Sequence, residues 1–212
     1  MRFYTALINK QPEVLVGFEQ GGTAYRLPLL ARLAPELAFS DMNALILGYD
    51  DKVKATLARL AANADTLQGA AVAVDEVQLL APIVRPLQDV VCLGINYDAH
   101  AQEAGRFSDE AFGGERPYTI YFSKRVNRAT ATGEKVPAYA GLVDSLDYEA
   151  ELGVVLGRDA KGVTKEEARD YVFGYTIIND ISARNLQTRH KQWYLGKSLD
   201  GFTPIGPVYC DG

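Results

Sequence analysis

The sequence predicts an α+β fold that is mainly β, and two observations support this class. Short runs rich in Val, Ile, Tyr and Phe recur between Gly, Pro, Asn and Asp residues, which is the pattern of β-strands. Apolar residues at helical spacing occur in only a few segments. The chain has 212 residues, of which 48% are hydrophobic and 23% are charged, so it can form a substantial core and is not disordered by composition.

The first part of the chain predicts strands followed by one or two helices. Strands are expected at residues 3–8, 14–18 and 24–27. Gly21 and Gly22 supply the hairpin turn before the last of these strands. Helical spacing within residues 40–67, behind the capping residues Asp50 and Asp51, predicts the helices.

Prolines at positions 82 and 86 flank an expected linker. We therefore predict a small α+β domain over residues 1–85 and a larger domain over residues 86–212. In the larger domain, a polar loop over residues 105–117 is long enough to act as a mobile lid. A capping box beginning at Thr164 opens a short helix that ends near Tyr171. Strands are expected at residues 90–93, 118–122, 149–156 and 173–179.

Composition and cysteine usage exclude several classes of protein. Lys and Arg number 22 and Asp and Glu number 27, giving a net charge of −5, which argues against a nucleic-acid-binding protein. Cys92 and Cys210 are far apart and show neither a disulfide framework nor zinc-ligand spacing. No signal peptide or membrane span is visible, so we expect a cytoplasmic protein without a membrane partner.

Three carboxylates could lie together in the larger domain. Glu149 and Glu151 are two residues apart on an expected strand, so both side chains lie on the same face. Asp180 follows the next expected strand, and pairing of the two strands would bring it to the same place. Carboxylates repel one another unless a cation neutralises them, and oxygen ligands select hard divalent ions over Zn²⁺. Spacing alone favours the simpler alternative, a solvated strand face.

A histidine and a glutamate form a second candidate group. His100 and Glu103 follow the candidate helix cap Asp98, and a helix would place both side chains on one face. The carboxylate could then orient the imidazole and raise its basicity toward water. The alternative is an ordinary surface pair. The other histidine, His190, lies in a basic stretch and is expected to face solvent.

Two lysines and two further polar residues complete the candidates. Lys124 and Lys197 could neutralise an acidic substrate, although isolated lysines are mostly exposed. Arg184 and Gln187 follow Asp180 and could orient groups around it, or make ordinary surface hydrogen bonds. The sequence contains no P-loop, dinucleotide-binding, serine-hydrolase or zinc-protease motif.

Taken together, the segments from Gly94 to Pro207 resemble the fumarylacetoacetate hydrolase family, and the N-terminal strands resemble the small domain that often precedes it. The blocks that carry the resemblance occur in the family order: Gly94-Ile95-Asn96-Tyr97 with His100 and Glu103; Phe122-Ser123-Lys124; Asp147 to Leu152; Asn179 to Gln187; Gly196-Lys197-Ser198; and Pro204-Ile205-Gly206-Pro207. Each block alone is a weak signal, but their joint order and spacing are specific.

The resemblance implies a fold, a cofactor and a set of site residues. The fold would be a mixed β roll or sandwich with a few short helices, preceded by the small α+β domain. The cofactor would be Mg²⁺ or Mn²⁺, with Ca²⁺ as a further candidate. The implied site residues form three groups: the metal ligands Glu149, Glu151 and Asp180; the water-activating dyad His100 and Glu103 on a lid; and the substrate contacts Lys124, Gln187 and Lys197.

The sequence also departs from the family pattern. Ala99 stands where a polar or acidic residue is common, and Arg125-Val126 follows Lys124 where proline is usual, and both departures bear on substrate choice. The family's catalytic domain continues beyond the last matching block, whereas this sequence stops at Gly212. We therefore expect a C-terminally truncated catalytic domain with an unpaired sheet edge.

The resemblance implies a metal-dependent enzyme that acts on a small 2-oxo acid. The expected reaction is hydrolysis of a carbon–carbon bond in a 2,4-dioxo acid of the acylpyruvate or fumarylpyruvate type, through a metal-stabilised enolate and water activated by the dyad. The alternatives that share this enolate are isomerisation of the 2-hydroxyhepta-2,4-diene-1,7-dioate type in aromatic catabolism and decarboxylation of oxaloacetate. A non-catalytic, truncated family member is a further alternative. Because family members are commonly homodimers, a homodimer is expected.

Overall fold

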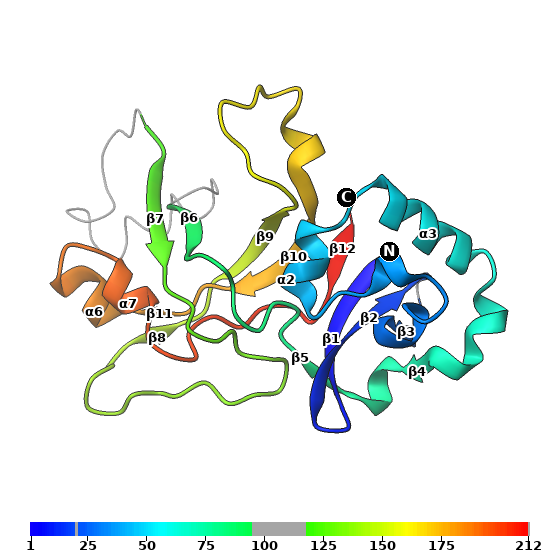
Figure 1. Ribbon diagram of the computed structural model, residues 1–212. Helices are drawn as coiled ribbons and strands as arrows, with labels where there is room; N and C mark the ends of the chain where they lie inside the picture. Colours follow the sequence, from blue (N-terminus) through cyan, green and yellow to red (C-terminus); the bar gives the residue numbers. More distant parts are fainter. Residues whose placement is uncertain (20, 95–117, 212) are drawn as a thin grey trace.

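The computed structural model describes residues 1–19, 21–94 and 118–211 (Figure 1). Its central feature is an eight-stranded sheet with the order β4-β3-β2-β1-β12-β10-β9, in which β5 also pairs with β1. The strands of this sheet are β1 (Arg2–Ile8), β2 (Gln11–Gly17), β3 (Thr23–Arg26), β4 (Ala71–Ala73), β5 (Gln78–Leu80), β9 (Ala150–Leu156), β10 (Val172–Asn179) and β12 (Tyr209–Asp211). The expected class, α+β and mainly β, is confirmed.

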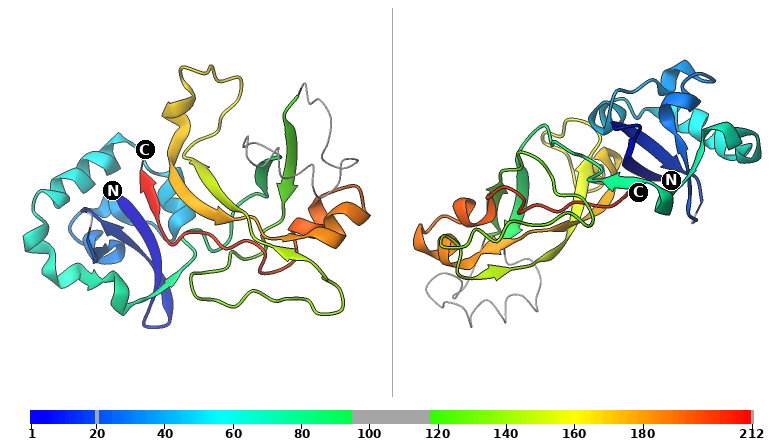
Figure 2. Two further views of the ribbon diagram at one scale, coloured as in Figure 1. Left: turned by 180° about the vertical axis from the view of Figure 1, so that it is seen from behind. Right: turned by 90° about the horizontal axis from the view of Figure 1, so that it is seen from below.

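Two small antiparallel sheets lie near the β9 end of the large sheet (Figure 1). One pairs β6 (Val90–Gly94) with β7 (Ile120–Lys124), and the other pairs β8 (Leu146–Asp147) with β11 (Ser182–Ala183). The short helices α6 (Arg184–Arg189) and α7 (Tyr194–Lys197) lie beside them, at the far end of the molecule from the N-terminal strands (Figures 1 and 2).

Two helices of the N-terminal part begin at aspartate caps. The segment expected to be helical contains α2 (Met42–Leu47) and α3 (Asp51–Ala61). Asp41 and Asp50 each accept a hydrogen bond from the backbone N–H three residues later, at 2.8 Å, so the predicted cap at Asp50 is confirmed. The remaining short helices are α1 (Leu27–Leu30), η1 (Pro35–Leu37), η2 (Ala64–Ala70), η3 (Val74–Glu76) and η4 (Ala168–Tyr171).

Several element boundaries differ from the sequence prediction. The strand expected at residues 14–18 begins at Gln11, because Asn9 and Lys10 adopt positive φ angles of 49° and 65° and close a tight β1–β2 hairpin. The Thr164 capping box forms, since its hydroxyl accepts from the Glu167 N–H at 3.3 Å, but the helix after it is a single 3-10 turn. Glu149 lies just before β9 rather than within it.

The main hydrophobic core joins the N-terminal strands and helices to β10. The Phe3 ring lies 5.4 Å from that of Phe173, and both rings contact Tyr49 edge-on. The same cluster contains Val53, Leu57 and Leu60 of α3, as their helical spacing predicts. The predicted domain boundary near residue 85 stays a prediction, although β1 and β10 belong to one sheet through β12.

Alternation along β9 separates two faces. One carries Leu152, Val154 and Leu156, which are all exposed, and the neighbouring Tyr175 and Ile177 of β10 extend this apolar face. The other face leads back to Glu149 and the polar site. Within the described ranges, no helix has the length and apolar character needed to cross a membrane.

Candidate metal and substrate site

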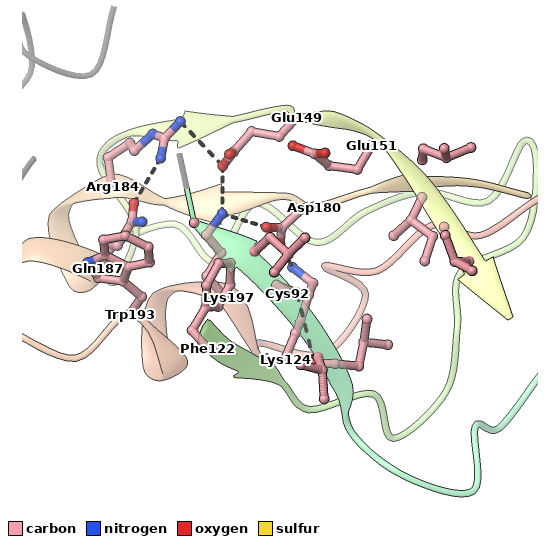
Figure 3. A pocket seen from close by; sticks show the side chains of 18 residues that line it. Cys92, Phe122, Lys124, Glu149, Glu151, Asp180, Arg184, Gln187, Trp193 and Lys197 are labelled. Atoms are coloured by element: carbon pink, nitrogen blue, oxygen red, sulfur yellow. Dashed lines mark hydrogen bonds and ion pairs between the residues drawn. The ribbon is translucent and has the colours of Figure 1, made fainter. Parts of the chain in front are cut away.

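A pocket of about 250 Å³ lies between the β6–β7 pair, the start of β9, the end of β10 and helices α6 and α7 (Figure 3). Six of the eight predicted site residues line it: Lys124, Glu149, Glu151, Asp180, Gln187 and Lys197. The other two, His100 and Glu103, lie outside the described residues, as does the expected lid over residues 105–117. The structure therefore brings the predicted metal ligands and substrate contacts together from four separate segments of the chain.

The backbone N–H and the backbone carbonyl of Glu149 are both hydrogen-bonded to residues at the end of β10. Its N–H donates to the side-chain oxygen of Asn179 at 3.0 Å, and its carbonyl accepts from the Asp180 N–H at 2.8 Å. These bonds continue the β9–β10 ladder by one residue beyond the strands. The predicted pairing of the two strands therefore places Glu149 and Asp180 next to each other.

The side chain of Glu149 is oriented by three donors that meet at one oxygen. Oε1 accepts from the Ser182 hydroxyl and from the Lys197 ammonium at 2.8 Å, and it lies 3.3 Å from the Arg184 guanidinium. Oε2 accepts no hydrogen bond from the part of the chain that the structure describes. Because only 12% of the Glu149 side chain is exposed, the alternative of a solvated strand face does not hold for this residue.

Asp180 is bound by two buried lysines. The Lys124 ammonium donates to Oδ1 at 2.7 Å, and the Lys197 ammonium donates to Oδ2 at 2.6 Å. Lys124 also donates to the Ile181 carbonyl at 3.0 Å. The expectation that isolated lysines are exposed is wrong here, since both side chains are almost fully buried.

Burial shifts the titration of two groups in the pocket. It lowers the pKa of Lys124 in spite of the opposing Asp180 carboxylate, because removal of water disfavours the ammonium form. It also raises the pKa of the Cys92 thiol to about 12, with the negative charge of Asp180 acting in the same direction. Cys92 is a free cysteine that stays in its neutral thiol form at neutral pH in the metal-free protein.

Arg184 and Gln187 are linked on the opposite side of Glu149. The Arg184 guanidinium donates twice to Asp147 Oδ2, at 2.6 and 3.0 Å, and once to Gln187 Oε1 at 2.9 Å. Gln187 is buried, so its amide is oriented by this contact. The hydrogen bonds of the two residues therefore lie beside the pocket rather than on the exposed surface.

Close packing of α6 and α7 delivers Lys197 to the carboxylates. A Cβ atom on Gly196 would lie 2.5 Å from the Gln187 backbone nitrogen and 2.8 Å from the Ala183 carbonyl. Only glycine permits this approach. The Lys197 ammonium also lies 5.1 Å from the centre of the Phe122 ring, which in turn contacts Trp193.

Sequence reasoning missed Ser182 and Asp147 as site residues. Both lie inside blocks that carry the family resemblance, but a single serine or aspartate has no spacing signal of its own. Their contacts follow from the β8–β11 pairing, in which Ser182 is directly opposite Asp147. A two-residue strand of this kind has no periodicity from which it could be predicted.

The donor set fits a hard divalent cation. Glu149, Glu151 and Asp180 line one pocket, in which their side chains lie near one another (Figure 3). Over the described residues, no group of three or more His, Cys, Asp or Glu side chains is already assembled for a metal ion. The lysine contacts of Asp180 and Glu149 are consistent with this result. The oxygen-only donor set and the open Oε2 of Glu149 nevertheless match the ligand preference of Mg²⁺ or Mn²⁺.

Comparison with known proteins adds a family and a fold. A sequence profile described as fumarylacetoacetate (FAA) hydrolase C-terminal matches residues 89–211. The curated protein oxaloacetate tautomerase YisK of Bacillus subtilis is 47% identical over 133 residues, which are 63% of this chain and 42% of that protein. The chain therefore spans less than half of this relative.

Solved structures match the whole chain. The fumarylacetoacetate hydrolase of Exiguobacterium antarcticum matches with a TM-score of 0.73 and 29% identity, over 100% of this chain and 66% of its own. The maleylpyruvate hydrolase of Sphingobium sp. SYK-6, solved with manganese(II) and pyruvate, matches with a TM-score of 0.69 and 22% identity, over 100% of this chain and 67% of its own. At that identity, the second likeness concerns the fold alone.

Proposed function

The chain belongs to the fumarylacetoacetate hydrolase family, and on that premise we propose that its pocket binds a divalent cation and enolises a small 2-oxo acid. The observation that carries the proposal is the meeting of Glu149 and Asp180 with two buried lysine ammoniums in one pocket. Carboxylates supply a cation site, and ammoniums supply donors for the oxygens of an acid.

Glu149, Glu151 and Asp180 would hold Mg²⁺ or Mn²⁺. A bound ion would supply Lewis-acid stabilisation of the negative charge that forms on the keto oxygen. Together with Asp147, the main partner of Arg184, these carboxylates carry one negative charge more than the positive charges of Lys124, Lys197 and Arg184. Addition of a divalent cation therefore leaves an excess of positive charge, which favours an anionic ligand such as a 2-oxo acid.

We propose keto–enol tautomerisation of oxaloacetate as the first activity to test. This reaction is the one named for the relative that is 47% identical. It requires that a proton leave the carbon beside the keto group and that a proton be added to the keto oxygen. The ammonium groups of Lys124 and Lys197 are donors for that oxygen, and their burial excludes water that would compete.

Hydrolysis of a 2,4-dioxo acid is the second candidate. The sequence observation that favours it is the His100 and Glu103 pair, since a carboxylate-oriented imidazole can take a proton from water. Isomerisation and decarboxylation use the same enolate and are separated from both reactions by their products. Cytoplasmic location and a homodimer remain part of the proposal.

The test begins with the site and proceeds to the reaction. Calorimetric titration of Mn²⁺, with and without oxalate as an enolate analogue, is made on the wild-type protein, on Glu149→Gln and on the exposed control Glu166→Gln. We expect oxalate to tighten Mn²⁺ binding in the wild type and the control, and Glu149→Gln to abolish the effect. Decay of enol-oxaloacetate absorbance is then compared with cleavage of an acylpyruvate.

Each result has a clear meaning. Faster decay of the enol without release of pyruvate or carbon dioxide supports tautomerisation, whereas cleavage of the acylpyruvate supports hydrolysis. Mn²⁺ binding without any effect of oxalate favours the non-catalytic alternative. Absence of Mn²⁺ binding, or binding that is unchanged in Glu149→Gln, would falsify the proposal.

A further inference from the structure

We propose that Ser182 is a positioning residue that fixes the Glu149 carboxylate so that Oε2 is presented to the divalent cation. This inference rests on the proposed metal site. It assigns a role to a buried hydroxyl that neither binds the cation nor contacts the substrate in the proposed function.

The contacts of Ser182 point to this role. Its side chain is fully buried, and its hydroxyl donates to Glu149 Oε1. A second acceptor, the Asp180 carbonyl, is 3.4 Å away. A serine hydroxyl has one hydrogen, and a bond to a carboxylate is stronger than a bond to a neutral carbonyl, so the hydrogen belongs to Glu149.

Three donors surround Glu149 Oε1, and among them Ser182 is the one whose main partner is Glu149. Lys197 is shared with Asp180 at 2.6 Å, and Arg184 makes its shorter bonds to Asp147 and Gln187. Removal of the Ser182 hydroxyl therefore changes the hold on Glu149 and leaves the other ion pairs of the site in place. This makes Ser182 a selective point at which to test orientation.

The position of the hydroxyl is set by the backbone. Ser182 pairs with Asp147 in the β8–β11 ladder. Asp147 lies two residues before Glu149 in the chain. Glu149 is itself fixed by Asn179 and by the Asp180 N–H. Both ends of the hydrogen bond thus belong to residues whose backbone is held by contacts other than this bond.

The physical consequence concerns rotation of the carboxylate. The terminal torsion of a glutamate is broad, so a carboxylate without an oriented partner samples many angles. With Oε1 engaged, Oε2 faces the pocket before the cation arrives. Loss of an outer partner of a metal ligand commonly weakens metal affinity by about 10- to 100-fold. After loss of the Ser182 hydroxyl, Glu149 Oε1 keeps two other donors, Lys197 and Arg184. We therefore expect the lower end of this range, a loss of Mn²⁺ affinity of about tenfold.

The experiment measures Mn²⁺ affinity by calorimetry and the electron paramagnetic resonance line shape of bound Mn²⁺, so it does not depend on enzyme activity. The variants are Ser182→Ala, Ser182→Thr, which keeps a hydroxyl, and Glu149→Gln as the loss-of-ligand reference. Thr130→Val is the matched control, because Thr130 is also buried and its hydroxyl donates to the Gly201 carbonyl, away from the carboxylates. Circular dichroism verifies the fold of each variant, and only folded variants are compared.

We expect Ser182→Ala to weaken Mn²⁺ binding about tenfold and to alter the line shape, while the hydroxyl-retaining variant and Thr130→Val stay near the wild type. Wild-type affinity in Ser182→Ala, or equal weakening in a folded Ser182→Thr, overturns the inference and leaves the metal site standing. Absence of Mn²⁺ binding by the wild-type protein overturns the proposed function and this inference with it.

Discussion

At the scale of single residues, the site depends on opposite charges that are buried together. Lys124 and Asp180 form the most buried pair, with side-chain exposures of 1% and 8%. A buried pair is costly to desolvate, so it adds little net stability, but removal of one partner leaves the other without compensation. The stability of the metal-free protein is therefore sensitive to each lysine.

Lys124→Met is predicted to destabilise the metal-free protein by about 3 kcal/mol, because Asp180 Oδ1 loses its ammonium partner while Asp180 stays buried. Urea unfolding followed by circular dichroism measures the loss. The exposed Lys161→Met serves as the control and should unfold like the wild type. An equally stable Lys124→Met would show that water reaches Asp180 freely.

A second residue-scale prediction concerns the glycine before Lys197. Gly196→Ala places a methyl group 2.5 Å from the Gln187 backbone nitrogen, so α6 and α7 must separate. We expect a loss of about 1–3 kcal/mol, together with weaker Mn²⁺ and oxalate binding because Lys197 moves. Gly69→Ala is the matched control, since no atom lies within 4 Å of the added Cβ. Unfolding and calorimetric curves that match those of Gly69→Ala would contradict the steric argument.

The residues of the site could be predicted from the sequence only in part. Strand spacing could bring Glu149, Glu151 and Asp180 together, because alternation and pairing of consecutive strands are local rules, but spacing alone favoured a solvated strand face, and their role as metal ligands came from the resemblance. Lys124, Gln187 and Lys197 were candidates by residue type, but their role as substrate contacts came from the resemblance, since nothing in an isolated lysine indicates burial. Ser182 was missed because its contact depends on a two-residue ladder between segments 35 positions apart.

At the scale of elements, the sequence predicted those strands and helices that local interactions determine. Strand alternation and the aspartate cap of α3 are such signals, and both agree with the structure. The helices α1, α6 and α7 have four to six residues each, which is too short for a helical period to show. They form through tertiary contacts, such as the close approach at Gly196.

The α3 cap gives an element-scale prediction. Asp50→Ala removes the acceptor of the Val53 N–H and a negative charge at the helix N-terminus, so we expect a loss of about 1 kcal/mol. The denaturation midpoint in urea measures it. Asp159→Ala, in an exposed loop, removes the same charge without a helix and should have no comparable effect. Equal midpoints for the two variants would indicate that α3 is held by packing alone.

At the scale of the whole molecule, the arrangement connects the candidate site to the N-terminal core through one sheet. Strand β10 carries Phe173 into the core at one end and leads to Asp180 at the other. Strand β12 lies between β10 and β1, with Cys210 opposite both Tyr175 and Arg2. Long-range pairing of this kind has no sequence signature, so it could not enter the prediction of two domains with a boundary near residue 85, which stays a prediction.

This connection predicts a single cooperative unfolding transition. Trp193 is the one tryptophan of the sequence, and it contacts Phe122 beside the site, so its fluorescence reports on the far end of the molecule from α3. Far-ultraviolet circular dichroism reports largely on the helices and the central sheet. Because β1, β12 and β10 share a ladder and Phe3 packs on Phe173, the two signals should have the same midpoint in urea.

A core variant tests whether equal midpoints of the two signals reflect one cooperative transition or two separate transitions with similar midpoints. Phe3→Ala removes the ring that joins Phe173 and Tyr49, which costs about 3–5 kcal/mol for a fully buried phenylalanine. In a cooperative molecule, the Trp193 midpoint must fall together with the circular dichroism midpoint, although Trp193 belongs to the opposite end. If the fluorescence transition stays at its wild-type midpoint, the site folds independently of the N-terminal core, and the boundary predicted near residue 85 divides two domains.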